Sequence, residues 1–271
     1  MESPSKHSPK NTTPEIKIMT QPTHSNQIEY EVWGKYALFT DPITRVGGEK
    51  CSYHIPTYES IKGITESIYW KPVFTWVVDE IRVMRPIRTE AKNMKPINID
   101  GIYSAHRDPS KKKQTPFNTL ATYTYLADVR YQVRAHFEWN LLREDLKSDR
   151  IAPKHLEIAQ RMIRKGGRRD IFLGTRECQG YVEPCIFGEG EGQHQQHGEL
   201  SYGNMFHGFD YPDITGQNEL VARFWNAKIG AGSIIRFPRA DDQSLTRRIL
   251  RDMKPNPPAS VGLNEPNNQL S

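Results

Sequence analysis

The sequence predicts an α+β fold, in which one domain of mixed strands and helices precedes a region rich in strands. Apolar and polar residues alternate over residues 28–32 and again over 129–139, which is the period of a strand. Apolar residues recur every three to four positions after Thr57 and after Pro153, the spacing of a helix. Between residues 179 and 238 glycine and aromatic residues become frequent, and this composition favours further strands.

The predicted elements follow one another in an informative order. Ile28, Tyr30 and Val32 share one face of the first strand, and Thr57 is expected to cap a helix that ends before Pro72. With the later elements the order becomes strand, helix, strand, strand, helix, strand, the ferredoxin-like arrangement of RNA-recognition (RRM-like) domains. Those later elements are expected at residues 74–84, 129–139, 153–166 and 170–173.

The chain divides into four predicted segments. Residues 1–27 and 254–271 are rich in Pro, Ser and Asn and poor in apolar side chains, so we expect disordered tails. Between them we expect an RRM-like domain at residues 28–178 and a β-rich C-terminal domain at residues 179–253. Met19 lies shortly before the first strand, so a chain that starts there is expected to fold normally.

The composition indicates an anionic partner and a reducing environment. Lys and Arg number 37 against 32 Asp and Glu, a net charge of +5 that fits nucleic acid but also many other enzymes. The three cysteines, Cys51, Cys178 and Cys185, cannot all pair and form no CxxC metal clip. No apolar stretch is long enough for a leader or a membrane span. We therefore expect a cytoplasmic protein with no membrane partner.

Lys154 and His155 form a local conflict at the first turn of the second predicted helix. Cations oppose the helix dipole there, whereas a bound anion would meet these side chains and the open backbone N–H groups together. Local rules are broken most often at functional sites. The alternative is a solvated first turn with both side chains in water.

A glycine-arginine turn closes the same helix. Its residues are Lys165, Gly166, Gly167, Arg168 and Arg169. Paired glycines let a backbone approach a phosphate closely, and guanidinium groups bind phosphate oxygens in pairs, so the turn is a candidate phosphate cradle. The alternative is a glycine helix cap followed by surface arginines.

Two further groups of residues carry weaker hypotheses. Arg134 and His136 lie on one polar face of the strand at residues 129–139, which suits RNA binding but also a solvent-facing sheet. His194, His197 and His207 follow the acidic run GEGEG, and we expect a mobile loop there, without a metal site. A basic run at residues 111–113 is expected to be a charged loop.

Three long motifs resemble one family. They are VWGKYALFTDP at residues 32–42, SYHIPTYESIKGITESIYWKP at 52–72 and KGGRRDIFLGTRECQGYVEPC at 165–185. The chain resembles the Dvulg-type (type I-C) CRISPR-associated precursor-RNA endoribonucleases, the Cas-five branch of the repeat-associated mysterious proteins. The resemblance implies an RRM-like domain that binds and cleaves RNA, and a β-rich C-terminal domain.

The resemblance also implies partners and catalytic residues. The partners are the CRISPR repeat RNA, whose 5′ handle is retained, and the backbone and large subunits of the type I-C Cascade complex. Cleavage is implied to need no cofactor and no metal. The family's Tyr, Lys and His correspond to Tyr69 of SIYWKP and to Lys154 and His155.

The chemistry expected from these three residues is internal transfer to a 2′,3′-cyclic phosphate. His155 would transfer a proton near neutral pH, Lys154 would stabilise charge on the phosphate oxygens, and Tyr69 would orient or help to deprotonate the 2′-hydroxyl. Without the resemblance, Tyr69 also fits a core aromatic residue. The alternative function is a subunit that binds the guide-RNA handle without cutting it.

Overall fold

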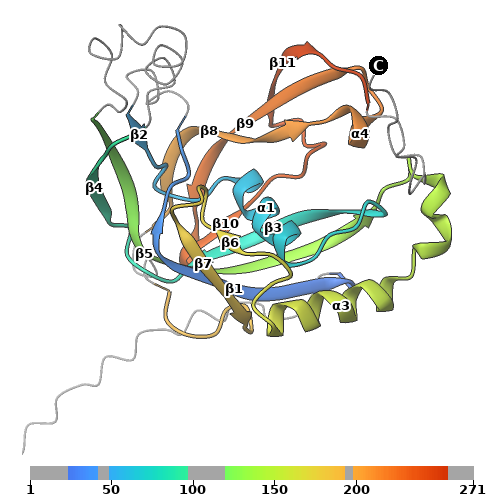
Figure 1. Cartoon of the computed structure of the whole chain (residues 1–271), viewed down its shortest axis with the longest axis horizontal. Helices are drawn as coiled ribbons and strands as arrows, with labels where there is room; N and C mark the ends of the chain where they lie inside the picture. The colour runs from blue at the N-terminus through green and yellow to red at the C-terminus, as the bar shows by residue number, and fades with distance from the viewer. Residues whose placement is uncertain (1–23, 42–48, 97–119, 193–197, 256–271) are drawn as a thin grey trace, which may run out of the picture.

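The structure, a computed structural model, describes residues 24–41, 49–96, 120–192 and 198–255. Its main feature is a large twisted sheet with the strand order β10-β3-β5-β1-β7-β6 (Figure 1). Two shorter strands, β2 (Lys50–Cys51) and β4 (Thr89–Met94), pair with the N-terminal part of β5. The strands on the main path are β1 (Gln27–Ala37), β3 (Phe74–Val83), β5 (Ala121–Trp139), β6 (Ile171–Phe172), β7 (Gln179–Pro184) and β10 (Ile234–Arg236).

The ferredoxin-like order is present in the middle of this sheet. The antiparallel run β3-β5-β1-β7 places the strands as the sequence predicts for such a domain, with β1 and β5 at its centre. The identity of the fourth strand is a correction. The segment expected there, residues 170–173, forms only the two-residue β6, and β7 takes the position beside β1.

Two helices, α1 (Tyr58–Ile68) and α3 (Ala152–Arg164), pack against one face of the large sheet. The Tyr30 and Thr65 hydroxyls, 2.7 Å apart, form a hydrogen bond that fastens α1 to β1. His155 of α3 packs on Phe137, which lies on the same face of β5 as the residue paired with Tyr30. Among the described residues, no helix is both long and apolar enough to cross a membrane.

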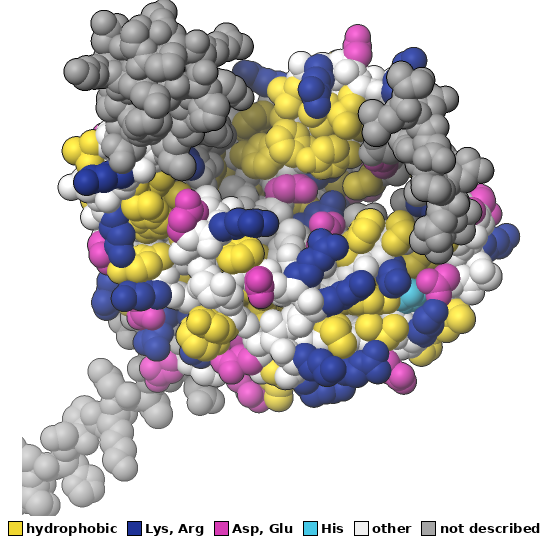
Figure 2. Space-filling model, in the orientation of Figure 1, with side chains coloured by type: hydrophobic (Ala, Val, Ile, Leu, Met, Phe, Trp, Pro, Cys, Tyr) yellow, Lys and Arg dark blue, Asp and Glu magenta, His cyan; other side chains and the backbone are white. Residues whose placement is uncertain are grey.

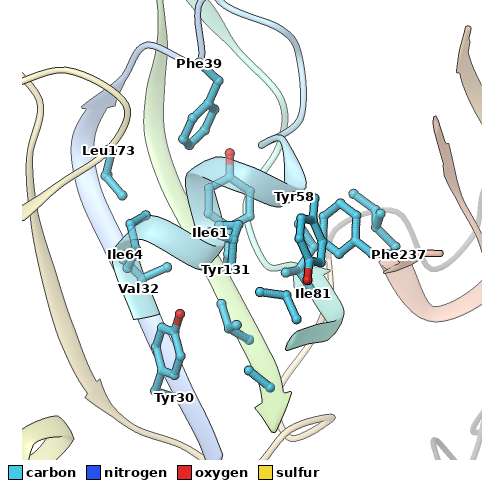
Figure 3. Packing of buried hydrophobic residues seen from close by; sticks show 14 of the residues in the cluster. Tyr30, Val32, Phe39, Tyr58, Ile61, Ile64, Ile81, Tyr131, Leu173 and Phe237 are labelled. Atoms are coloured by element: carbon cyan, nitrogen blue, oxygen red, sulfur yellow. The ribbon is translucent and has the colours of Figure 1, made fainter. Parts of the chain in front are cut away.

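Helix α1 forms where the sequence predicts it. The Thr57 hydroxyl caps the helix by accepting a hydrogen bond from the Ser60 N–H at 3.2 Å. Ile61 and Ile64 point into the core beside Tyr30, as Figure 3 shows. The helix ends at Tyr69, whose backbone is extended.

A second, three-stranded sheet covers the other side of α1 (Figure 1). Tyr58 of α1 stacks on His207 of this sheet at 4.3 Å and packs edge-on against Phe237. Burial and the nearby charge of Arg223 lower the pKa of His207 to about 3, so this histidine is neutral. The strands of this second sheet are β8 (Leu200–Asp210), β9 (Glu219–Ile229) and β11 (Thr246–Asp252), and the short helix α4 (Pro212–Thr215) lies between β8 and β9. Two other short helices, η3 (Glu144–Asp149) and η4 (Ala231–Ser233), lie elsewhere in the chain.

Several elements of the structure cross or lie outside the segments expected from the sequence. His207 lies in β8 and not in a mobile loop; His194, His197 and the basic run at residues 111–113 are outside the described residues. The division at residue 178 does not separate two units, because β7 and β10 both join the large sheet. The strand β1 starts at Gln27, the last residue of the expected N-terminal tail, and His24 stacks on His136 at 3.8 Å.

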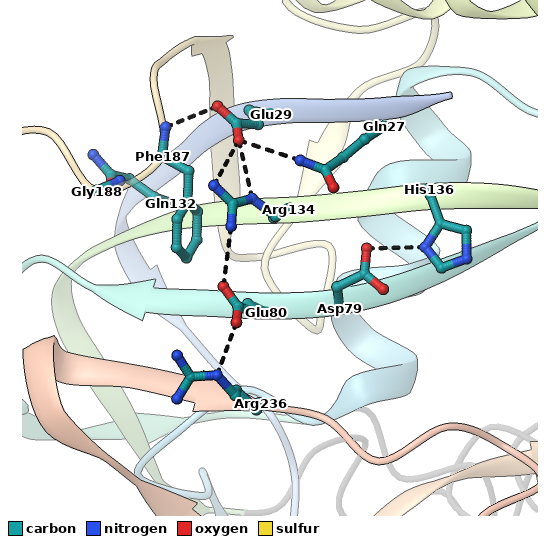
Figure 4. Close-up of polar contacts among 10 residues, drawn as sticks. All are labelled: Gln27, Glu29, Asp79, Glu80, Gln132, Arg134, His136, Phe187, Gly188 and Arg236. Carbon is teal, nitrogen blue, oxygen red and sulfur yellow. Dashed lines mark hydrogen bonds and ion pairs between the residues drawn. The ribbon is translucent and has the colours of Figure 1, made fainter. Parts of the chain in front are cut away.

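A network of polar side chains lies on the outer face of the large sheet (Figure 4). Arg134 of β5 pairs with Glu29 of β1 at 2.9 Å and with Glu80 of β3 at 3.4 Å. Glu80 in turn pairs with Arg236 of β10. The buried guanidinium group of Arg134 therefore ties β5 to β1 and β3, and Arg236 extends the network to β10.

The segment after β7 covers this network. The backbone N–H of Phe187 donates to Glu29, and the N–H of Gly188 donates to the Gln132 side chain. The Phe187 ring lies 4.3 Å from the Arg134 guanidinium carbon. The start of the GEGEG run is thus held against the sheet by hydrogen bonds, where a mobile loop was expected, and Gln132, Arg134 and His136 of the polar face of β5 are buried.

This arrangement predicts that Arg134 acts on stability. Arg134→Met should lower the free energy of unfolding by about 2–3 kcal/mol, because it leaves Glu29 and Glu80 without their shared cation. The loss should be below that of a fully buried pair, since both carboxylates keep about a fifth of their surface exposed. Urea unfolding measures the change.

The control is Arg236→Met, which removes an exposed partner of the same Glu80 and should change stability by less than about 1 kcal/mol. Equal losses for the two variants would contradict the network. RNA affinity should be unchanged in Arg134→Met molecules that remain folded.

Candidate functional site

The structure brings Tyr69, Lys154 and His155 together where the end of α1 meets the start of α3. The Tyr69 hydroxyl lies 2.8 Å from Nδ1 of His155. The other ring nitrogen of His155, Nε2, lies 2.7 Å from the backbone carbonyl oxygen of Asp149. The three predicted residues therefore form one constellation with Asp149, although they come from segments 86 residues apart in sequence.

These contacts determine where the protons are. A carbonyl oxygen can only accept, so Nε2 of His155 carries hydrogen and donates it to Asp149. In the neutral imidazole Nδ1 then accepts, and the Tyr69 hydroxyl donates to it. Burial raises the pKa of Tyr69, and the negative charge of Asp149 raises it further, although Arg168 opposes both. Tyr69 is therefore a protonated phenol that donates a hydrogen bond to His155.

His155 sits in an aromatic pocket. Phe74, Phe137 and Trp139 surround its ring at centroid distances between 5.3 and 6.3 Å, and only 1% of its surface is exposed. The interpretation of His155 as a solvated first-turn residue is therefore wrong. The ring faces inward among these aromatic side chains, so it does not lie in solvent at the start of the helix.

Lys154 stays at the surface, with 48% of its side chain exposed, and pairs with the carboxylate of Asp149. The hydrogen bond from Lys154 lowers the pKa of Asp149, and the charges of Lys154, His155 and Lys71 contribute in the same direction. A phosphate group that reaches this position would compete with Asp149 for Lys154. The site thus combines one exposed cation with a buried phenol and imidazole.

The glycine-arginine turn lies next to this constellation. The backbone N–H groups of Gly166 and Gly167 bond to the last turn of α3, and Gly166 adopts a φ of +81°, so the pair caps the helix. The backbone N–H groups of Arg168 and Arg169 donate to the last carbonyls of α1. The turn therefore joins the ends of both helices, and its backbone is occupied by this role.

The side chains of the turn remain available. Lys165, Arg168 and Arg169 are exposed, and none of them forms a salt bridge within the part of the chain that the structure describes. Figure 2 shows Lys and Arg side chains gathered over the lower part of this face, where α3 runs. The turn therefore acts as a cap through its backbone and as a cationic surface through its side chains.

Arg134 and His136 are not part of this surface. Both lie on the opposite face of β5, in the buried network described above, and their predicted RNA contact has no support in this geometry. Burial lowers the pKa of His136, but hydrogen bonds and charges from Asp79 and Glu138 outweigh it and raise the pKa above its ordinary value.

One group of potential metal ligands occurs among the described residues, formed by His24, Asp79 and His136. The rings of His24 and His136 stack with an interplanar angle of only 19°. Lone pairs of ring nitrogens lie in the ring planes, so two stacked imidazoles do not point at one ion. This group also lies on the outer face, away from Tyr69. It does not supply the site with a metal.

Sequence reasoning missed Asp149, Lys71 and Trp70 as parts of this surface. Asp149 contacts His155 through its backbone carbonyl, and every residue has a backbone carbonyl, so the sequence gives no sign of this contact. Lys71 and Trp70 directly follow Tyr69 in the SIYWKP motif, so their position beside the site could have been predicted from adjacency. Trp70 is exposed over 43% of its surface, which is unusual for tryptophan.

Comparison with known proteins gives one consistent family. The family described as CRISPR-associated protein (Cas_Cas5), in its Cas5d form, matches residues 27–237. A relative from Mannheimia succiniciproducens, named CRISPR pre-crRNA endoribonuclease Cas5d, is 30% identical over 178 residues, which cover 60% of this chain and 68% of the relative. A relative of the same name from Thermus thermophilus is 30% identical over 168 residues, 58% of this chain and 64% of the relative.

Solved structures agree with this family. One described as a CRISPR-associated protein is 32% identical, with a TM-score of 0.62, and the match covers 81% of this chain and 96% of that one. A functionally uncharacterized Streptococcus mutans protein is 34% identical, with a TM-score of 0.58 and the same coverage. The chain therefore belongs to the Cas5d family of CRISPR-associated proteins.

Proposed function

We propose that this chain is a metal-independent endoribonuclease that cleaves precursor CRISPR RNA within the repeat. The observation that carries the proposal is the hydrogen bond from Tyr69 to His155 with Lys154 beside it. Both curated relatives bear the name of a precursor-crRNA endoribonuclease, which supports the same activity here. Tyr69, Lys154 and His155 are its proposed catalytic residues.

The geometry supports a proton relay. The RNA 2′-hydroxyl would give its proton to the Tyr69 oxygen while Tyr69 passes its own proton to Nδ1 of His155. The 2′-oxygen then forms a bond to the adjacent phosphorus, and the bond from phosphorus to the 5′-oxygen breaks. The leaving 5′-oxygen takes a proton from water, and the hydroxide that remains is neutralised by the proton that His155 has gained. The products are a 2′,3′-cyclic phosphate and a 5′-hydroxyl.

Two other groups would assist the transfer. Asp149 has a carboxylate oxygen 3.7 Å from Nε2 of His155, close enough to stabilise the imidazolium that the relay creates. Lys154 would leave Asp149 and stabilise the charge that builds on the phosphate oxygens. Tyr69 is only 3% exposed, so RNA binding has to shift the covering side chains before the 2′-hydroxyl reaches the phenol.

We also propose that the cleaved 5′ handle stays bound and that the protein joins the backbone and large subunits of the type I-C Cascade complex. Family membership supports both points. Its RNA-binding residues would be Lys165, Gly166, Gly167, Arg168 and Arg169, which form the exposed turn beside the site. We place the protein in the cytoplasm, where its RNA substrate is made, and its three free cysteines fit that compartment.

A second candidate function is RNA binding without cleavage. The observation in its favour is that both ring nitrogens of His155 are occupied and the ring is buried, as in a purely structural histidine. A binding-only protein would leave purified repeat RNA intact, whereas the enzyme would cut it once at a fixed position.

The cleavage assay separates these two functions. His155→Ala should lower the single-turnover cleavage rate by about a hundredfold or more, because a positioned acid or base contributes at least that much. RNA affinity should change little, since phosphate contacts dominate it. A 2′-deoxy substitution at the cut position should block cleavage, and excess EDTA should leave the wild-type rate unaltered.

Full activity of His155→Ala, or cleavage of the 2′-deoxy substrate, would refute this mechanism. Loss of binding together with cleavage would instead assign His155 a structural role. Phe137→Leu serves as a control for disturbance of the aromatic pocket, because it alters the packing around His155 and leaves its hydrogen bonds in place.

A second prediction concerns the arginines of the turn. Arg168→Ala combined with Arg169→Ala should weaken RNA binding and flatten its dependence on salt. The logarithmic slope should fall by about 0.7 for each phosphate of a single strand that these arginines neutralise in the wild type. Fluorescence anisotropy over a salt series measures this.

The control for the turn is Arg248→Ala with Arg251→Ala on β11, which removes the same charge from exposed positions in the other sheet. Its salt slope should stay at the wild-type value. Equal slopes for both double variants would show that the turn arginines are ordinary surface charge.

A further inference from the structure

The glycine-arginine turn separates two hollows in the surface. One, of about 510 Å³, is lined by Glu66, Trp70 and Lys71 together with Arg168 and Arg169. Its position beside Trp70 and Lys71 puts it next to Tyr69 in the chain. Arg168 and Arg169 also line the second hollow, on the other side of the turn.

The second hollow, of about 580 Å³, lies between the turn and β7. Its wall includes Lys165, Asp170 and Tyr181, and it shares Arg168 and Arg169 with the first hollow. Both volumes fall in the range of sites that hold small ligands, roughly 300–1,000 Å³. In each hollow three cationic side chains face a single carboxylate, so each is suited to an anionic occupant.

Tyr181 is held with one face open. Alternation along β7 turns Gly180 and Val182 inward and Tyr181 outward, where 51% of its surface is exposed. Gly180 cannot be replaced easily, because a Cβ there would lie 3.0 Å from the Leu173 side chain. The Tyr181 ring rests on Trp33 of β1, with centroids 4.7 Å apart. The ring is therefore ordered before any ligand arrives.

We infer that these features form a track for single-stranded RNA, in which one base stacks on Tyr181, the backbone crosses Arg168 and Arg169, and another base stacks on Trp70. An exposed aromatic face accepts any unpaired base, whereas a base inside a duplex has no open face to offer. This inference rests on the proposed function and adds to it the strandedness of the RNA at the turn and two residues that hold it.

The placement of the track favours RNA over a protein partner. Exposed aromatic and arginine side chains also occur at protein interfaces. Here, however, the cations have no salt bridge within the described residues, and one end of the track reaches the residue that follows Tyr69. A strand on this path would therefore pass beside the segment that carries Tyr69.

The test uses the full chain and repeat RNA with 2-aminopurine at successive positions. Tyr181→Ala and Trp70→Ala should each weaken binding about five- to a hundredfold, the usual effect of losing one stacked base. Tyr181→Phe and Trp70→Phe should bind nearly as well as the wild type, because stacking needs only the ring face. The fluorescence of 2-aminopurine should be quenched at two positions of the RNA, both by the wild type and by the Phe variants. Tyr181→Ala should abolish the quenching at one of these positions, and Trp70→Ala should abolish it at the other.

The controls separate this inference from the proposed function. Tyr202→Ala, a half-buried tyrosine of β8 in the other sheet, should leave affinity unchanged. If the wild type binds and cuts RNA while both Ala variants bind it normally, the track is wrong and the proposed function stands. Normal RNA binding with lost association to other complex subunits would assign the aromatic residues to a protein interface, and would also overturn the inference. Failure of the wild type to bind RNA would overturn both.

Discussion

The hydrogen bond between Tyr69 and His155 is the contact on which the functional end of the molecule depends. A phenol and an imidazole that are buried among aromatic rings each need a hydrogen-bond partner, and here Tyr69 and His155 are partners of one another. The bond fastens the end of α1 to the start of α3, and the Asp149 carbonyl completes it from the other side. Lys154 is the neighbour of His155 on α3 and points in a different direction, so it lies at the surface beside this contact. The same contact is thus a structural tie and the proposed path of the proton.

The two faces of the large sheet have different roles. On the outer face Arg134, Glu29 and Glu80 satisfy one another beneath the segment that carries Phe187, so these three side chains have little left with which to bind a ligand. On the inner side the helices end at the edge of the sheet, and their capping turn leaves Arg168 and Arg169 with exposed side chains. The charged side chains that pair within the sheet stabilise the fold, whereas the exposed arginines at the helix ends are accessible to a phosphate backbone.

Local patterns were sufficient for most of the framework. The Thr57 cap, the alternation of β1 and β5 and the glycine stop after α3 are all short-range signals, and the structure confirms each of them. Family membership, expected from three motifs, is confirmed as well. The errors concern contacts between distant segments. Alternation along β5 shows that Arg134 and His136 share a polar face, but not that Phe187 and its neighbours cover that face. Likewise, a strand at β7 can be predicted, but its position beside β1 is set by tertiary pairing. The burial of His155 was hidden for the same reason, since its surroundings come from β3 and β5.

The central claim is that Tyr69 and His155 act as one unit in cleavage, and a double-variant cycle on single-turnover rates tests it most directly. Tyr69→Phe and His155→Ala should each slow cleavage of saturating repeat RNA by about a hundredfold or more, and the double variant should be about as slow as the slower single variant. Each variant's unfolding free energy would be measured alongside to exclude loss of the fold. Multiplicative losses in the double variant, or a Tyr69→Phe protein that cleaves at the wild-type rate, would contradict the relay.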